Sequence, residues 1–253
     1  MSLLDAIILG IVQGLTEFLP VSSSGHLVVI QSFLKNFSQP GVLFDVTLHL
    51  GTVLAVLLYF RKRFIEILTN KKLLLLLLIS TAVTGVIGVA FKDTFEKMFS
   101  DVKLVGASFI VTALILLFAE RVKPGTKAEK EMTWLNSLFI GLIQGIAIIP
   151  GISRSGSTIA GGLFIKLDRK FAAEFSFLLS VPAVLGAALL QTKDLTRADM
   201  LNINIAYYLS GLLAAAVAGF VCTKMLVNII QKQKLYYFSI YLLIIGTIVL
   251  IVR

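Results

Sequence analysis

Long apolar runs separated by short charged clusters dominate this chain of 253 residues. A helix that crosses a bilayer takes about 20 apolar residues, with a range of about 17–25. Six runs approach that length, and we predict a transmembrane helix in each: 42–60, 73–91, 105–119, 171–190, 205–227 and 236–252. The pattern therefore predicts an all-α polytopic membrane protein.

Two further apolar regions are each interrupted by a polar break. In the first, apolar residues 3–19 and 27–34 flank the break 20–25; in the second, 138–149 and 159–165 flank the break 150–158. Irregular backbone at membrane depth is tolerated only where protein buries it or where it lines a wet cavity. We therefore predict two re-entrant helical hairpins, 2–36 and 134–167, each with a second helix too short to cross.

The order of these elements predicts an inverted-topology repeat. Each half, 1–131 and 132–253, would hold one hairpin and three spans. A hairpin that enters and leaves on one face adds no crossing, so the three spans of the first half place the start of the second half on the opposite face of the membrane. The sequences agree, because GLIQGIAIIPGISRSGST in the second half resembles GIVQGLTEFLPVSSSGH in the first. Such repeats place broken helices at a binding site near the bilayer midplane.

Charge adds an orientation to this picture. The formal net charge of +9 could indicate nucleic acid, but the basic residues lie between apolar runs, so we expect no nucleic-acid partner. Fifteen of the 23 lysines and arginines fall in the connections 61–72, 121–132, 166–170 and 224–234. The positive-inside rule places that face in the cytoplasm, with both termini and the mouth of the first hairpin outside.

Glu17 and Arg154 are charged residues in otherwise apolar surroundings. A charge at the bilayer centre costs about 2.5–3.5 kcal/mol on insertion scales, so such residues usually mark function. A structural ion pair that joins the two hairpins is the alternative. Gln13 and Glu17 are four residues apart and would share one helix face, where an amide and a carboxylate could hold one ligand.

Hydroxyl groups cluster at the expected helix starts after both breaks. Unpaired backbone N–H groups at a helix N-terminus suit a phosphate, and the planar guanidinium of Arg154 can bind phosphate oxygens in a bidentate way. His26 could act as general base, general acid or nucleophile, and Ser23, activated by His26 and oriented through Glu17, is the alternative nucleophile. The remaining hydroxyls of the predicted anion site are Ser22, Ser24, Ser153, Ser155 and Thr158.

Three further polar residues have open interpretations. Asp45 and His49 are four apart at the start of a span, where they either face a cavity or bond to each other. Glu174 lies near a membrane edge, as a supporting partner of the site or as a solvated charge.

The motifs QGLTEFLPVSSSGH and PGISRSG together resemble those of the undecaprenyl-diphosphate phosphatases, also called bacitracin-resistance proteins, over essentially the whole chain. The resemblance implies hydrolysis of undecaprenyl diphosphate to the monophosphate and inorganic phosphate, which recycles the lipid carrier of cell-wall synthesis. It assigns Gln13 and Glu17 to the (E/Q)xxxE positions, Ser23 and His26 to the nucleophile or acid–base positions, and Arg154 to phosphate binding. It also implies a divalent cation, magnesium or calcium, with Glu17 as its anchor.

This chain departs from the family pattern at three positions. Gln13 stands where many members have glutamate, which leaves one carboxylate for a metal; Ser24 stands where threonine is common; and His49 occupies a place where glutamine would be expected. The implied setting is a multi-pass protein of the bacterial inner membrane, with a polyprenyl diphosphate substrate, membrane lipids as neighbours and a site that opens to the outer face. A homodimer and a transporter or flippase of an anionic lipid or solute, working through the same midplane anion site, remain open alternatives.

Overall fold

A computed structural model describes residues 1–253 except 35–36, 41, 124, 194–202 and 232–234, and it describes no side chains in 224–231. The regular elements of the described residues are helices, apart from one isolated β-bridge between Lys127 and Leu167. Five of these helices are long and apolar enough to cross a membrane, and a sixth crossing is obtained if one bent pair is counted as a single span. The fold is that of a multi-pass helical membrane protein.

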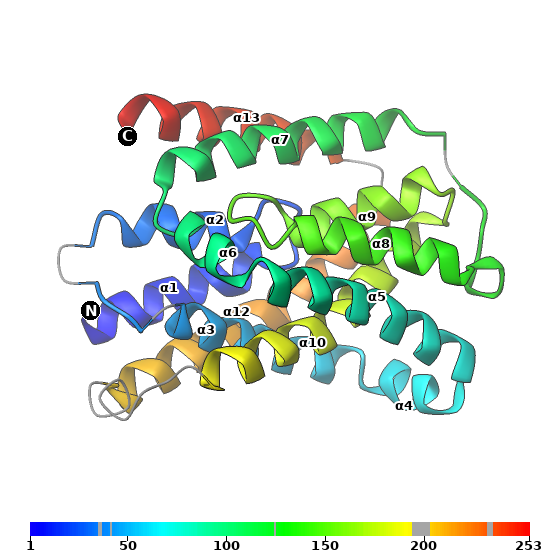
Figure 1. The fold of residues 1–253 in the computed structure, drawn as a ribbon, viewed down its shortest axis with the longest axis horizontal. Helices are drawn as coiled ribbons and strands as arrows, with labels where there is room; N and C mark the ends of the chain where they lie inside the picture. The colour runs from blue at the N-terminus through cyan, green and yellow to red at the C-terminus, as the bar shows by residue number, and fades with distance from the viewer. Residues whose placement is uncertain (35–36, 41, 124, 194–202, 232–234) are drawn as a thin grey trace.

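The predicted spans all correspond to helices. They are α3 (Leu43–Tyr59), α5 (Lys71–Ala90), α7 (Val102–Arg121), α10 (Arg169–Lys193), α12 (Ile205–Gln231) and α13 (Leu235–Val252). In Figure 1, α7 and α13 run side by side along one edge, and both chain termini lie at the same end of the molecule. Large apolar side chains such as Val86 and Leu189 are exposed, as expected for helices that face lipid.

The two interrupted regions form pairs of short helices. The first pair is α1 (Leu3–Thr16) and α2 (Ser23–Gln31), and the second is α8 (Trp134–Ile146) and α9 (Arg154–Phe164). Both breaks lie near the middle of the molecule (Figure 1). The second helix of each pair begins earlier than expected, at Ser23 and Arg154, because the serine before it caps the helix: Ser22 accepts from the Gly25 N–H and Ser153 from the Gly156 N–H.

Glycines of the repeated Gly-x-x-Gln-Gly motif allow two matching helix contacts. A Cβ on Gly10 would lie 2.3 Å from the Gly211 carbonyl oxygen of α12, and a Cβ on Gly141 would lie 2.7 Å from the Ser80 carbonyl oxygen of α5. Any side chain would clash, so glycine lets α1 pack tightly on α12 and α8 on α5. The second glycine, Gly14 or Gly145, makes a similarly close approach one turn later.

Two short helices were not predicted: α4 (Arg61–Thr69) and α6 (Lys92–Met98), where we expected connections. The α3 and α4 axes differ by 78°. Arg63 of α4 pairs with Glu66, with Glu129 of the 3₁₀ helix η1 (Glu129–Glu131) and with Glu174 of α10. Glu174 therefore belongs to an ion-pair network that joins both halves. The basic residues Lys35, Arg197, Lys232 and Lys234, and the side chain of Lys224, lie outside the described residues.

Candidate active site

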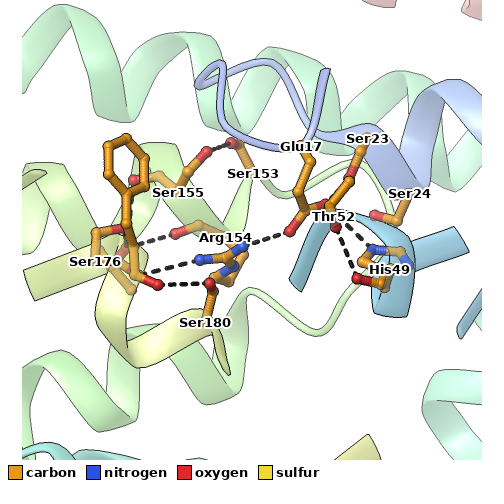
Figure 2. Close-up of polar contacts among 12 residues, drawn as sticks. Glu17, Ser23, Ser24, His49, Thr52, Ser153, Arg154, Ser155, Ser176 and Ser180 are labelled. Atoms are coloured by element: carbon orange, nitrogen blue, oxygen red, sulfur yellow. Dashed lines mark hydrogen bonds and ion pairs between the residues drawn. The ribbon is translucent and has the colours of Figure 1, made fainter. Parts of the chain in front are cut away.

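A buried carboxylate, Glu17, sits where the two helix breaks meet (Figure 2). Its Oε2 accepts hydrogen bonds from Gln13 Nε2 at 2.8 Å and from Ser23 Oγ at 2.6 Å. Its Oε1 pairs with the guanidinium of Arg154 from the second break. The expected shared face of Gln13 and Glu17 is confirmed, and the two embedded charges neutralise each other.

Arg154 is the first residue of α9 and is held from two sides. One terminal nitrogen donates to Glu17, and the other donates to the backbone carbonyl of Ser176 on α10 at 3.1 Å. Glu17 and Arg154 both line a cavity. The guanidinium is therefore oriented in advance, at a place where an anion can reach it.

The backbone of the first break is strained at Ser22, whose φ is +65°. Positive φ is uncommon for a residue with a Cβ, and such strain clusters at functional sites. His26 donates from Nδ1 to the Ser22 carbonyl oxygen at 2.7 Å, which helps to hold this conformation. The turn brings Ser23 Oγ onto Glu17.

The second break contacts the first through two glycines. Gly151 has a φ of +91°, and a Cβ on it would lie 2.6 Å from the Ser108 Cβ. A Cβ on Gly25 would lie 2.9 Å from the Gly151 Cα and 2.5 Å from the Phe109 ring. Only glycine fits at both positions, so these residues allow the two breaks to pack closely against each other.

His26 is turned toward α13 and α7. Its Nε2 is 2.6 Å from the Tyr241 hydroxyl, its ring is stacked on the Tyr241 ring, and Phe109 lies against it. Since Nδ1 donates to a carbonyl, Nε2 accepts from the tyrosine. Both ring nitrogens are thus engaged, and the role of His26 in the reaction stays a prediction.

The predicted hydroxyls divide into two groups. Ser22, Ser23, Ser24 and Ser153 line the cavity together with Arg154. Ser155 instead donates to the Leu19 carbonyl at 3.0 Å, and Thr158 donates to the Arg154 carbonyl at 2.8 Å and lies 2.6 Å from Ser176 Oγ. Ser155 and Thr158 therefore hold α9 against the first break and against α10.

The cavity has a volume of about 310 Å³. Its polar end holds Glu17, the serines and Arg154, and its walls come from α3, α5, α6 and α10. The cavity extends to α6, where Lys92 and Glu96 line it. Two glycines in its walls, Gly85 and Gly186, face open space, since a Cβ on either would meet nothing within 4 Å.

His49 and Asp45 have separate places. The His49 ring lines the cavity, with Nε2 3.3 Å from Glu17 Oε2 and Nδ1 2.7 Å from the Asp45 backbone carbonyl. The Asp45 carboxylate is buried and accepts from Gln31 at 2.5 Å and Gln39 at 3.2 Å. His49 therefore joins the site, whereas the Asp45 carboxylate fastens α2 and the segment before α3.

Sequence reasoning missed Ser176 and Tyr241. Ser176 contributes through its backbone carbonyl, which carries no signal in a sequence. Tyr241 lies 215 positions from His26 in an apolar helix, where an aromatic residue ordinarily indicates packing.

Comparison with known proteins identifies the family. The family model described as bacitracin resistance protein BacA matches residues 6–248. A protein named undecaprenyl-diphosphatase from Carboxydothermus hydrogenoformans is 44% identical over 257 residues, covering 100% of this chain and 98% of that protein. Proteins with the same name from Alkaliphilus metalliredigens and Methanosphaera stadtmanae are 42% identical over 271 residues and 38% identical over 275 residues. Each of these two alignments spans 99% of this chain and 98% of the relative. With a family match over nearly its whole length, and with both motifs placed at one buried site, this chain belongs to the bacitracin resistance protein BacA family.

Proposed function

We propose that this chain is an integral membrane phosphatase that hydrolyses undecaprenyl diphosphate to undecaprenyl phosphate and inorganic phosphate, and so recycles the lipid carrier of cell-wall synthesis. The observation that carries the proposal is the Ser23–Glu17–Arg154 arrangement at the polar end of an otherwise largely apolar cavity. A nucleophile, a proton acceptor and an anion-binding group meet there. The names of the relatives support the same activity and substrate.

Arg154 and the N-terminal ends of α2 and α9 are proposed to bind the phosphates. When a diphosphate enters, its oxygens compete with Glu17 for the guanidinium, which binds phosphate well through its planar fork. The free N–H groups at the starts of α2 and α9 add favourable dipoles. Ser22, Ser24 and Ser153, which line the cavity, are the proposed neighbours of the bound phosphates. Gln13, predicted to bind substrate, is fully buried outside the cavity lining and acts through its hydrogen bond to Glu17, while Ser155 and Thr158 act through α9.

Ser23 is the nucleophile that the geometry favours. Its Oγ–H donates to Glu17 Oε2 at 2.6 Å, so the carboxylate can take the proton as Oγ attacks the terminal phosphorus. The bond from that phosphorus to the bridging oxygen breaks, undecaprenyl phosphate leaves, and water then hydrolyses the phosphoserine to release inorganic phosphate. His26 remains the second candidate and, through its bond to Ser22, also positions Ser23.

A divalent cation, magnesium or calcium, is proposed at Glu17. The carboxylate lines the cavity, which suits an oxygen-binding ion. The described residues contain no group of three or more His, Cys, Asp and Glu side chains that could hold a metal, so phosphate oxygens would have to complete its coordination shell. A bound cation would neutralise part of the diphosphate charge.

The polyprenyl tail is proposed to lie along the apolar cavity walls. Val46, Ile148 and Leu190 are among the lining residues. Gly85 of α5 and Gly186 of α10 leave space in the cavity walls because neither has a side chain. Burial of apolar chain would add to the affinity that the phosphates supply.

The proposed architecture is an inverted repeat of 1–131 and 132–253, with re-entrant hairpins 2–36 and 134–167. It is supported by the matching glycine contacts of α1 on α12 and α8 on α5. The charge bias supports both termini and the cavity mouth on the outer face of the bacterial inner membrane. Membrane lipids would surround the exposed apolar faces, and a homodimer remains an open proposal.

Purified protein with a soluble short-chain prenyl diphosphate tests the activity. Phosphate release should depend on Ser23, Glu17 and Arg154; unchanged release from Ser23→Ala, Glu17→Ala and Arg154→Ala would contradict the proposal. The Ser23–Glu17 contact favours hydrolysis over the transporter alternative, because transport needs no nucleophile. Liposomes that move labelled substrate without releasing phosphate would reverse that preference.

A further inference from the structure

The bend between α3 and α4 holds another pocket, which shares no lining residue with the cavity at Glu17. Its volume is about 340 Å³, within the range of small-molecule sites. We call it the corner pocket, and its lining residues are Tyr59, Phe60, Arg61, Lys62, Arg63 and Glu66. Three of these side chains are cationic and one is anionic, so the pocket suits a negatively charged ligand.

The cations of the corner pocket differ in their availability. Arg63 already pairs with three carboxylates, including Glu66 of the pocket itself. Arg61 and Lys62 are exposed, and neither of them pairs with a carboxylate among the described residues. An anion that enters the pocket would therefore be neutralised mainly by Arg61 and Lys62.

The bend turns α4 toward the membrane plane. We predict α3 as a span, and the α3 and α4 axes differ by 78°. A helix at that angle to a crossing helix lies nearly parallel to the bilayer surface, as interfacial amphipathic helices do. In Figure 1, α4 lies at the end of the molecule opposite both termini. The corner pocket is therefore expected at the level of the lipid headgroups.

The outer face of α4 is apolar as well as basic. Ile65 and Leu68 are 66% and 75% exposed, whereas Phe64 and Ile67 pack against the core. Arg61, Ile65 and Leu68 are spaced i, i+4 and i+7, so they share one face of the helix. A cation beside exposed aliphatic side chains matches a lipid, which has a charged headgroup and apolar chains. A soluble anion would leave Ile65 and Leu68 uncovered.

We propose that the corner pocket binds the phosphate headgroup of an anionic phospholipid, whose acyl chains lie against Ile65 and Leu68. Arg61 and Lys62 neutralise the phosphate, as basic clusters at the ends of membrane helices do with anionic lipids. The bound lipid fastens α4 in the interface. The proposed orientation puts this lipid in the cytoplasmic leaflet. The site is independent of the proposed phosphatase reaction, which takes place in the other cavity.

Native mass spectrometry of the full chain in detergent tests the headgroup preference. Dioleoylphosphatidylglycerol and dioleoylphosphatidylcholine carry the same acyl chains, so their affinities differ through the headgroup. Wild type should bind the phosphatidylglycerol about tenfold more tightly. Arg61→Gln/Lys62→Gln should remove most of this preference, and Ile65→Gln/Leu68→Gln should weaken binding of both lipids. Thermal unfolding without added lipid should match wild type in both variants, because the substituted side chains are exposed.

Lys97→Gln/Lys103→Gln is the matched control. It also removes two exposed cations, but from α6 and α7, which follow the far end of α5. This variant should keep the preference for phosphatidylglycerol. An equal loss in the two charge variants would indicate a general effect of net charge. That outcome, or a wild type without any preference, would overturn the inference.

A phosphatidylglycerol with a photoactivatable acyl chain tests the location. Crosslinking and peptide mapping should find the label on the peptide that contains Ile65 and Leu68. Unlabelled phosphatidylglycerol should compete for this labelling, and excess inorganic phosphate should not. Label mainly on other helices would overturn the inference, and so would competition by inorganic phosphate, which would identify a site for the free anion.

Discussion

Glu17 and Arg154 come from opposite halves of the chain, 137 positions apart, and form an ion pair that lines the cavity. The pair joins the two helix breaks and places the proposed anion-binding group, Arg154, beside the proposed proton acceptor, Glu17. The sequence left two interpretations of these charges open, a functional site and a structural link. Both interpretations fit the geometry, because the same ion pair connects the two helix breaks and lines the cavity.

The two roles of this pair can be separated by charge-neutral variants. Arg154→Gln alone leaves Glu17 buried without its partner, and removing one partner of a buried pair costs roughly 3–5 kcal/mol of stability. We expect the double variant Glu17→Gln/Arg154→Gln to recover much of the lost thermal stability and none of the phosphate release. Thermal unfolding in detergent and a phosphate assay on the same samples check this. Recovery of activity in the double variant would contradict the proposed roles.

Ser23 and Ser24 offer a comparison between neighbouring hydroxyls. Ser23→Ala removes the group that bonds to Glu17 and should lower kcat by about a hundredfold or more. Ser24 lines the cavity, and its hydroxyl lies 3.4 Å from Ser22 Oγ, so Ser24→Ala should act mainly on KM. Rapid quenching in SDS at neutral pH, with a substrate labelled in its terminal phosphate, should trap label on the wild-type Ser23 that survives later acid treatment. Label on His26, which acid would remove, would identify the other candidate as the nucleophile.

Tyr241→Phe isolates the hydrogen bond that α13 makes to His26. The hydroxyl donates to Nε2 at 2.6 Å, while Nδ1 keeps its own bond to Ser22. One such bond contributes about 0.5–1.5 kcal/mol, so kcat should fall roughly 2- to 12-fold with little change in KM. Tyr59→Phe is the control, since the Tyr59 ring packs against Phe60 and Phe220 far from the site. An equal loss in both variants would show that the Tyr241 hydroxyl has no particular role.

Arg63 should matter to stability more than to activity. It pairs with carboxylates from α4, η1 and α10, in a network that the cavity does not reach. Arg63→Ala leaves Glu129 and Glu174 without this partner, and we expect a lower unfolding temperature with kcat largely retained. Lys62→Ala, the exposed neighbour, should change neither. High salt should reduce the difference between wild type and Arg63→Ala, because it screens partly exposed pairs.

Local patterns predicted much of this molecule. Pro20 and the hydroxyls after it predicted the first break, and the spacing of Gln13 and Glu17 predicted their contact, because both depend on nearby chain. The short helix α4 was missed since its charged residues interrupt the apolar pattern that predicts spans. The partners of His26 and His49 depend on how distant helices pack, so the spacing of Asp45 and His49 could not show that one ring nitrogen meets Glu17.

Gly186 provides a test of where the substrate tail lies. The position faces open space beside the cavity, so Gly186→Ala should be tolerated, and alanine favours the helix by about 1 kcal/mol. Gly186→Leu would instead fill part of the space with a branched side chain. If the tail lies there, Gly186→Leu should lower kcat/KM for a long-chain prenyl diphosphate several-fold more than for a two-isoprene analogue, whose tail ends sooner. Rates with both substrates for wild type and the two variants give this ratio directly. An equal loss for both substrates would indicate a disturbed site, and no loss would place the tail elsewhere.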